Sequence, residues 1–130
     1  MNTSRKTFPK IERLSWKRHI DLLFQQGASH VAFPLRMIYL PVDQDDRGAS
    51  IAMLVSVPKK RLKHAVDRNY VKRRVRESYR LRKNELIHLY TAKNKKLLLA
   101  FLYLDHGTCS FAKIDRAMKK LLQTIQEQIA

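Results

Sequence analysis

Residues 59–83 read KKRLKHAVDRNYVKRRVRESYRLRK, and this stretch holds five Lys and seven Arg, 12 of the 27 basic residues in the chain. Only Asp67 and Glu77 oppose that charge within the stretch. Its apolar residues are spaced through the stretch: Val66, Val71, Val75 and Tyr79. This spacing indicates an ordered helix with one buried side, not a disordered basic tail. So much positive charge in one segment predicts a polyanionic partner.

A helical wheel at 100° per residue, with Val71 at zero, divides this segment into two arcs. The apolar arc covers about 0° to 80° and contains Val71, Val75, Tyr79, Leu86 and Leu89. The cationic arc covers about 100° to 200° and contains Asn69, Lys72, Arg73, Arg76, Arg80 and Lys83. Like charges four residues apart destabilise a helix by about a few tenths of a kcal/mol per pair, and the planar Arg side chain suits phosphate oxygens. The arc therefore predicts a phosphate-binding surface, with an ordinary solvated helix face as the alternative.

The composition of the chain is that of one folded, strongly basic domain. Its 130 residues carry a formal net charge of +16, and 45% of them are hydrophobic. We expect a flexible basic arm at 1–10 and a single domain over 11–130. The charge predicts fast, salt-dependent association with nucleic acid. The sequence has neither a run of about 20 apolar residues for a membrane span nor the apolar centre of a signal peptide at its start, so we expect a cytoplasmic protein without a membrane partner.

The apolar pattern outside the basic segment predicts two further helices. Ser15 is a suitable N-cap and Gly27 a suitable end for a first helix over about 15–26. Ser110 is a probable N-cap for a C-terminal helix. The apolar stripe of that helix contains Phe111, Ile114, Met118, Leu121, Leu122 and Ile125.

Three segments have the pattern of strands. In 35–42, Leu35, Met37 and Tyr39 alternate with Arg36, Ile38 and Leu40. The polar residues 43–48 predict a hairpin to a second strand at 49–57, paired antiparallel with the first. The nearly continuous apolar run at 96–104 predicts an interior strand. Because a long helix separates the last two strands, they are expected to be parallel.

No residue of the chain is assigned a catalytic or metal-binding role. The five His residues are dispersed and share no spacing with a nucleophile or ligand partner. Asp43, Asp45 and Asp46 could hold a hard cation, but a polar hairpin loop is the favoured reading of this cluster. Cys109 is the single cysteine, which excludes an internal disulfide and a thiolate zinc cluster.

The order of residues in the basic segment resembles the signature of the bacterial ribonuclease P protein subunit. That signature is a Lys-Lys pair, a spacer, and then Ala-x-x-Arg-Asn-x-x-Lys-Arg-x-x-Arg-Glu. The matching residues are Lys59, Lys60, Ala65, Arg68, Asn69, Lys72, Arg73, Arg76 and Glu77. The resemblance covers about residues 11–125. It has two departures, namely Tyr70 where the family usually has Arg, and Ile20 where many relatives have an aromatic residue.

The resemblance implies an α+β fold. The expected architecture is a single α-β sandwich like the second domain of ribosomal protein S5, with a mixed sheet of about four strands and three helices. It also implies a left-handed crossover through the basic helix, contrary to the usual right-handed preference.

The resemblance further implies an endoribonuclease that is a ribonucleoprotein. Its partners are a catalytic RNA and precursor tRNA, from which it removes the 5′ leader. Mg²⁺ is expected to be held mainly by the RNA subunit and the substrate, and the protein alone, a monomer before assembly, is expected to be inactive. A ribosomal or other structural RNA-binding protein and a DNA-binding regulator are the alternatives.

Two sets of site residues follow from the resemblance. The expected contacts to the catalytic RNA are Lys59, Lys60, Arg68, Asn69, Lys72, Arg73, Arg76 and Arg80. The expected floor of a cleft for the single-stranded leader, between the sheet and the first helix, is Ile20, Phe24, Met37 and Tyr39. Aromatic side chains in such a cleft could stack unpaired bases without selecting their sequence. Simple core packing is the alternative for these four residues.

Overall fold

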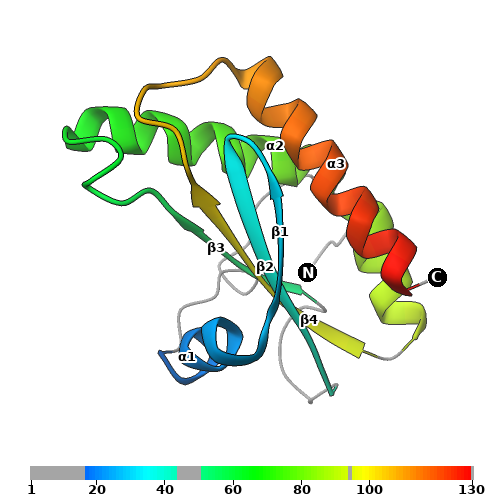
Figure 1. Ribbon diagram of the computed structural model, residues 1–130. Coiled ribbons are helices and arrows are strands. Elements are labelled where there is room, and N and C mark those ends of the chain that lie inside the picture. Colours follow the sequence, from blue (N-terminus) through cyan, green and yellow to red (C-terminus); the bar gives the residue numbers. More distant parts are fainter. Residues whose placement is uncertain (1–16, 44–50, 94, 130) are drawn as a thin grey trace, which may run out of the picture.

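The structure, a computed structural model, describes residues 17–43, 51–93 and 95–129, and Figure 1 shows their arrangement. Four strands form one mixed sheet in the order β1-β2-β4-β3. The elements are α1 (Lys17–Gln26), β1 (Ala28–Ala32), β2 (Leu35–Asp43), β3 (Ile51–Ser56), α2 (Ala65–Ala92), β4 (Lys95–Tyr103) and α3 (Phe111–Ile129). The predicted α+β sandwich is confirmed. The arm predicted at 1–10 and the N-cap predicted at Ser15 lie outside the described residues.

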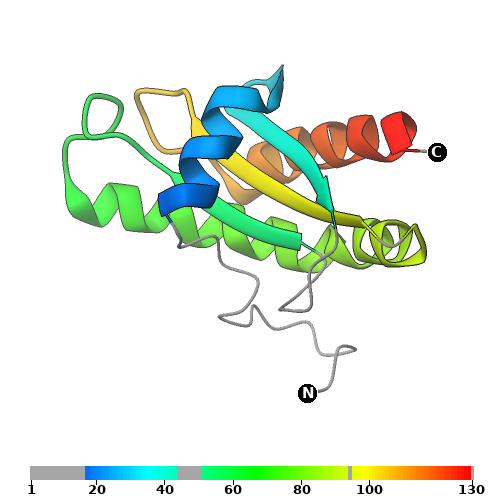
Figure 2. The same cartoon turned by 90° about the horizontal axis from the view of Figure 1, so that it is seen from below.

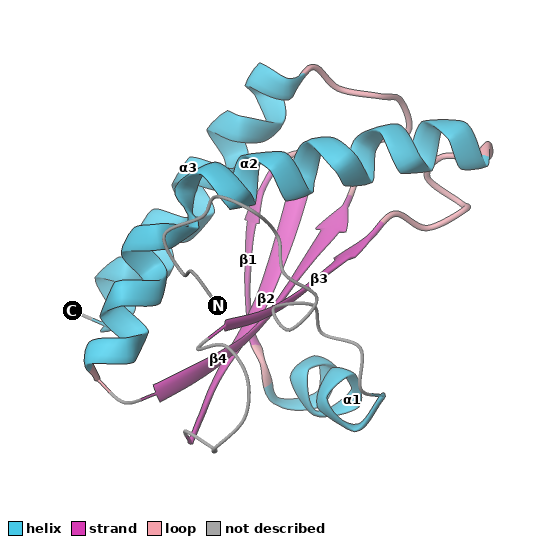
Figure 3. Cartoon of the chain, turned by 180° about the vertical axis from the view of Figure 1, so that it is seen from behind, coloured by secondary structure: helices cyan, strands magenta, loops and turns pink. Residues whose placement is uncertain are grey.

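The helices cover the two faces of the sheet unequally. α1 lies alone on one face, and α2 and α3 lie together on the other (Figures 1 and 2). Seen from behind, α2 crosses the strands on the side opposite α1 (Figure 3). The main core therefore lies between the sheet and the α2–α3 pair, and a smaller apolar cluster lies under α1.

The order of the strands corrects one prediction. β2 and β3 do not form a hairpin, because β4 lies between them, antiparallel to β2 and parallel to β3. The side chains of Leu97 to Phe101 are at most 2% exposed, as expected of an interior strand that is covered on both faces. The parallel pairing of β3 and β4 through α2 is confirmed, and the left hand of this crossover stays a prediction.

β1 is a strand that the sequence pattern did not reveal. Its five residues, ASHVA, pair antiparallel with β2 from Ala28–Tyr39 to Ala32–Leu35. A tight turn containing a cis Phe33–Pro34 peptide bond joins the two strands. The segment is short and mostly exposed, so it lacks the clear alternation that marks a half-buried strand.

α2 buries the side that the helical wheel predicted, with two changes at its C-terminal half. Val71, Val75, Tyr79 and Leu86 are fully buried. Leu89 is only half-buried, and the neighbouring Tyr90 is buried instead. Lys83 is 2% exposed, so its place on the exposed cationic surface was wrong. On the helical wheel Lys83 lies at about 120°, beside the fully buried Tyr79 at about 80°, so this part of α2 buries a wider arc than its apolar residues alone indicate.

The predicted start of α3 is confirmed by a direct capping contact. The backbone N–H of Lys113 donates a hydrogen bond to Oγ of Ser110 over 3.2 Å. This bond satisfies one of the backbone donors that a helix leaves unpaired at its first turn. The apolar stripe follows, with Ile114, Met118, Leu121, Leu122 and Ile125 all buried against the main core.

Candidate nucleic-acid interface

The N-terminal half of α2 and the turn before it present a continuous set of basic side chains. Lys59 and Lys60 are exposed on the turn that follows β3. Asn69 and Arg73 are exposed on α2. The remaining predicted contacts, Arg68, Lys72, Arg76 and Arg80, are half-buried. We call these eight residues the α2 cationic surface. The structure brings all eight onto one helix and its leading turn, as the sequence predicted.

Arg68 shapes the entry to α2 as well as contributing charge. Its Nη1 donates hydrogen bonds to the backbone oxygens of Leu62, over 3.0 Å, and Lys63, over 2.8 Å. The N-cap residue His64 makes no side-chain capping bond. Arg68 therefore holds the loop that precedes the helix, and the position of Lys59 and Lys60 depends partly on it.

Arg80 is paired with Glu77, one of the two acidic residues in the N-terminal half of α2, the other being Asp67. Its guanidinium donates hydrogen bonds to both carboxylate oxygens of Glu77, with Nε 3.1 Å from Oε2. The hydrogen bond from Arg80 lowers the pKa of Glu77, and the same bond raises the pKa of Arg80. Both side chains are partly exposed, 27% for Arg80 and 44% for Glu77. Glu77 therefore offsets Arg80 and leaves Arg73 as the more available guanidinium.

Tyr70, the departure from the family signature, packs against a neighbouring guanidinium. The Cζ atom of Arg74 lies 3.5 Å from the centre of the Tyr70 ring, a cation–π contact. Tyr70 is 38% exposed. One face of the ring is thus covered by Arg74, on the flank of α2 away from the cationic surface.

Two of the four residues predicted for the leader cleft lie on the wrong face of the sheet. Met37 is fully buried and Tyr39 is 7% exposed, and both belong to the main core under α2 and α3. They cannot form a floor beneath α1, because side chains in a strand alternate between faces. The placement of Met37 and Tyr39 in the cleft was therefore wrong. Ile20 and Phe24 do lie on α1, Ile20 against the smaller cluster and Phe24 45% exposed.

The sheet surface that faces α1 is made by the other residues of each strand. We call it the α1 groove. It contains Ile38, Leu40 and Val42 of β2, Ala52 and Leu54 of β3, and Leu98, Ala100 and Leu102 of β4. Several of these side chains are only partly buried, so the groove keeps an accessible apolar surface beside α1. The apolar character of Ile38 and Leu40 is visible in the sequence, but it does not distinguish this face from the equally apolar face of Met37 and Tyr39.

Gly27 fixes the distance between α1 and this groove. Its N–H donates a 2.8 Å hydrogen bond to the oxygen of Leu23 at the end of α1. A Cβ atom at position 27 would lie 2.5 Å from that oxygen and 2.6 Å from Cγ2 of Ile38. Because both approaches are shorter than real Cβ contacts, only glycine allows α1 to end this close to β2.

The described residues contain neither a group of side chains that could bind a metal ion nor a helix that could span a membrane. Among residues 17–43, 51–93 and 95–129, no three His, Cys, Asp or Glu side chains lie close enough together to hold a metal ion. The aspartates at 45 and 46 and the side chain of Asp43 lie outside the described part. None of the helices in the same ranges has the length and apolarity to cross a bilayer.

Fold and surface together define a class of protein: a small α+β domain with a basic helix on its surface. The model of the family described as Ribonuclease P matches residues 8–126, and the chain belongs to that family as a protein component of ribonuclease P. It is 40% identical over 122 residues to the ribonuclease P protein component of Porphyromonas gingivalis, covering 92% of this chain and 88% of the relative. The corresponding protein of Chlorobaculum tepidum is 38% identical over 102 residues, covering 73% and 66%.

Solved structures agree with the fold. The ribonuclease P protein of Staphylococcus aureus superimposes with a TM-score of 0.65 at 18% identity, covering 88% of this chain and 94% of that one. A mutant of the same protein gives a TM-score of 0.69, covering 90% of each chain. At this identity the likeness concerns the fold alone. Family membership sets aside the ribosomal protein and the DNA-binding regulator that the charge alone left open.

Proposed function

We propose that the α2 cationic surface docks this protein on the catalytic RNA of ribonuclease P. The observation that carries the proposal is the exposure of Lys59, Lys60, Asn69 and Arg73 at one end of a long helix. Arg suits phosphate oxygens through its planar pair of donors. Each phosphate that such a side chain neutralises releases condensed counterions, so binding gains free energy and becomes salt-dependent.

We propose that the α1 groove holds the 5′ leader of precursor tRNA. Phe24 at its edge is the aromatic side chain of α1 with the most exposed surface, and Arg36 is exposed on the same face of β2 as Ile38. An unpaired base stacked on such a ring contributes about 1–3 kcal/mol, and the contact accepts any base. Apolar side chains without hydrogen-bond donors for base edges suit leaders of varied sequence.

We assign the chemistry, hydrolysis of one phosphodiester bond, to the RNA subunit. Mg²⁺ held mainly by the RNA and the substrate would activate the attacking water and stabilise the leaving oxygen. Among the described residues, no three His, Cys, Asp or Glu side chains could hold a metal ion together, and we assign no catalytic role to a side chain of the protein. The protein contributes binding and positive charge, as a cytoplasmic monomer before assembly.

Reconstitution tests this proposal. Purified protein is incubated with precursor tRNA, with and without its cognate RNA subunit, over a range of magnesium concentrations. We expect no cleavage by the protein alone and cleavage by the complex at magnesium concentrations where the RNA alone is slow. Cleavage by highly purified protein in the absence of RNA subunit would overturn the assignment of the chemistry.

Salt dependence tests the docking surface separately. Arg73→Ala and Arg76→Ala are each expected to weaken binding of the RNA subunit and to reduce the slope of log K against log salt by about 0.9, one phosphate contact each. Lys120→Ala, which removes one exposed charge from α3, is the matched control and should change the slope less. Unchanged slopes for both Arg variants would place these residues outside the interface.

A further inference from the structure

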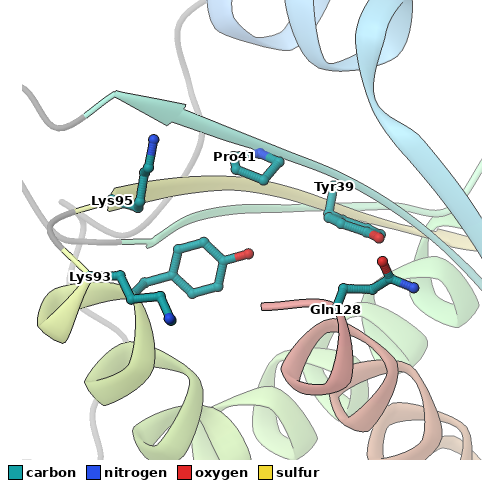
Figure 4. A pocket seen from close by; sticks show the side chains of 6 residues that line it. Tyr39, Pro41, Lys93, Lys95 and Gln128 are labelled. Atoms are coloured by element: carbon teal, nitrogen blue, oxygen red, sulfur yellow. The ribbon is translucent and has the colours of Figure 1, made fainter. Parts of the chain in front are cut away.

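A pocket of about 630 Å³ opens on the sheet face opposite the α1 groove, where the strands meet the C-terminal ends of α2 and α3. Figure 4 shows Tyr39 and Pro41 of β2 and Lys95 of β4 on one side, with Lys93 and Gln128 at the helix ends on the other. Tyr90 completes the lining. Lys93 lies 13 residues beyond Arg80, about 20 Å along the helix direction at 1.5 Å per residue. The pocket is therefore separate from the α2 cationic surface.

Two buried tyrosines line this pocket, and the ring of Tyr39 also stacks on His30 with 5.7 Å between the ring centres. Tyr90 is 2% exposed and Tyr39 is 7% exposed. Neither hydroxyl oxygen is among the enclosed, unpaired polar atoms of the described residues, and both tyrosines line the pocket. Burial, followed by the charge of nearby Tyr39, raises the pKa of Tyr90 to about 12. The Tyr90 hydroxyl thus keeps its proton at neutral pH and can donate a hydrogen bond to an acceptor that enters the pocket.

The remaining lining selects a negatively charged ligand. Lys93, Lys95 and Gln128 are exposed at the rim, and the six described lining residues include two ammonium groups and no carboxylate. Pro41 and the tyrosine rings supply an apolar wall. The volume lies within the range of about 300–1,000 Å³ typical of small-ligand pockets, which fits one nucleotide and excludes a duplex.

We propose that this pocket binds one nucleotide of a single-stranded RNA segment. Its phosphate lies between Lys93 and Lys95, and a ribose or base oxygen accepts the hydrogen bond of the Tyr90 hydroxyl. RNA is the favoured source of the nucleotide because the chain carries a net charge of +16 and belongs to an RNA-processing family. The proposal depends on neither the α2 cationic surface nor the α1 groove, and it gives the protein an RNA contact on its opposite face.

An NMR titration of the full-length protein tests the proposal. The probes are an oligouridylate pentamer, uridine monophosphate and inorganic phosphate. We expect the pentamer to shift the backbone amides of Tyr90, Lys93 and Lys95. The double variant Lys93→Ala/Lys95→Ala should bind the pentamer at this site about tenfold or more weakly, because two charged contacts to phosphate are lost. Tyr90→Phe, which keeps the buried ring, should weaken binding by about two- to tenfold.

A charge-matched control separates a built site from general attraction. Lys119→Ala/Lys120→Ala removes two exposed charges from α3 outside the pocket. Equal weakening in the two double variants would overturn the proposal, as would pocket amides that do not move with the pentamer. If uridine monophosphate or phosphate bound as tightly as the pentamer, the pocket would be a site for a free nucleotide or an anion. That result would overturn the proposal that it binds single-stranded RNA. A polyglutamate peptide that shifts these amides more strongly than the pentamer would overturn it in favour of an acidic protein.

The titration also separates this site from the docking surface. Amides of the α2 cationic surface, such as those of Asn69 and Arg73, report RNA binding there in the same spectra. Shifts at those residues without shifts at Tyr90 and Lys93 would refute the pocket and leave the proposed function standing. Shifts confined to the pocket residues would support the pocket and refute RNA binding by the α2 cationic surface.

Discussion

Replacing Asp115 with alanine should destabilise the fold by breaking the polar bridge between α2 and α3. The carboxylate accepts hydrogen bonds from Arg82, with Nε 2.7 Å from Oδ1 and Nη2 2.6 Å from Oδ2. It also accepts one from Oγ of Ser78 over 2.6 Å. Ser78 is fully buried, so Asp115→Ala leaves its hydroxyl without this partner and out of reach of water.

The expected loss follows from the exposure of the two donors. The unpaired Ser78 hydroxyl costs about 1–3 kcal/mol. The Arg82 side chain is 36% exposed and regains water, so its pairing adds only about 1 kcal/mol. The total of about 2–4 kcal/mol corresponds to a fall in Tm of about 6–16 °C, at about 3–4 °C per kcal/mol for a domain of this length.

Thermal unfolding followed by circular dichroism measures this loss, and a double-mutant cycle tests its origin. Ser78→Ala should destabilise the parent protein, but it should be nearly neutral in the Asp115→Ala background, because the orphaned hydroxyl is then gone. Glu85→Ala is the control. Glu85 is exposed, and its Oε2 accepts a long hydrogen bond of 3.5 Å from Nε2 of Gln126. Glu85→Ala should therefore change the free energy of unfolding by no more than about 0.5 kcal/mol. Equal effects of Ser78→Ala in both backgrounds would refute the reasoning.

The pH dependence of the same difference provides an independent check. Hydrogen bonds from Arg82, opposed by burial and assisted by Ser78, lower the pKa of Asp115. A carboxyl group whose pKa is lower in the folded state contributes stability above its unfolded pKa and loses it in acid. The gap between the parent protein and Asp115→Ala should be constant near neutral pH and shrink as the pH falls below about 4. A gap that grew in acid would contradict this sign.

Two further predictions concern the two surfaces that we propose bind RNA. Glu77→Gln removes the charge that offsets Arg80, so it should tighten binding of the RNA subunit and steepen the slope of log K against log salt by about 0.9. For the same reason, Arg80→Ala should change this slope less than Arg73→Ala. Filter binding over a salt series measures both effects, and an unaltered slope in Glu77→Gln would contradict the first. Met37→Ala should lower the free energy of unfolding by about 2–5 kcal/mol because it leaves a cavity in the core, but the folded variant should still cross-link to the leader. Phe24→Ala should reduce cross-linking to the leader with little change in Tm. The reverse pattern would mean that Met37 contacts the leader.

Local periodicity was enough to predict the helices and the composition of their surfaces. The 3.6-residue repeat separates the apolar arc of α2 from its cationic surface, whatever the rest of the chain does. Ser110 and the stripe that follows it predicted α3 for the same reason. Lys83 is the exception, because its burial depends on how α2 packs in the fold and not on the charge of its side chain.

The cleft residues could not be predicted in the same way, because both faces of β2 are apolar. Alternation correctly separated Leu35, Met37 and Tyr39 from Ile38 and Leu40, but it contains no information on which set meets α1. The pairing of β4 between β2 and β3 is likewise a contact between segments distant in sequence. The weak pattern of β1 becomes a strand only because the exposed edge of β2 is available to pair with it.

The sequence by itself determined the amphipathic and strongly basic character of α2, and the order of residues in 59–83 pointed to the family of the chain. These properties are local, since charge, periodicity and residue order all lie within one segment. Only the tertiary structure decided which sheet face lies under α1, which basic side chains stay exposed, and that Tyr39 and Tyr90 share a pocket. Those outcomes depend on packing between segments that are distant in the sequence. The position of β4 between β2 and β3, for example, decides which side chains are neighbours on both faces of the sheet.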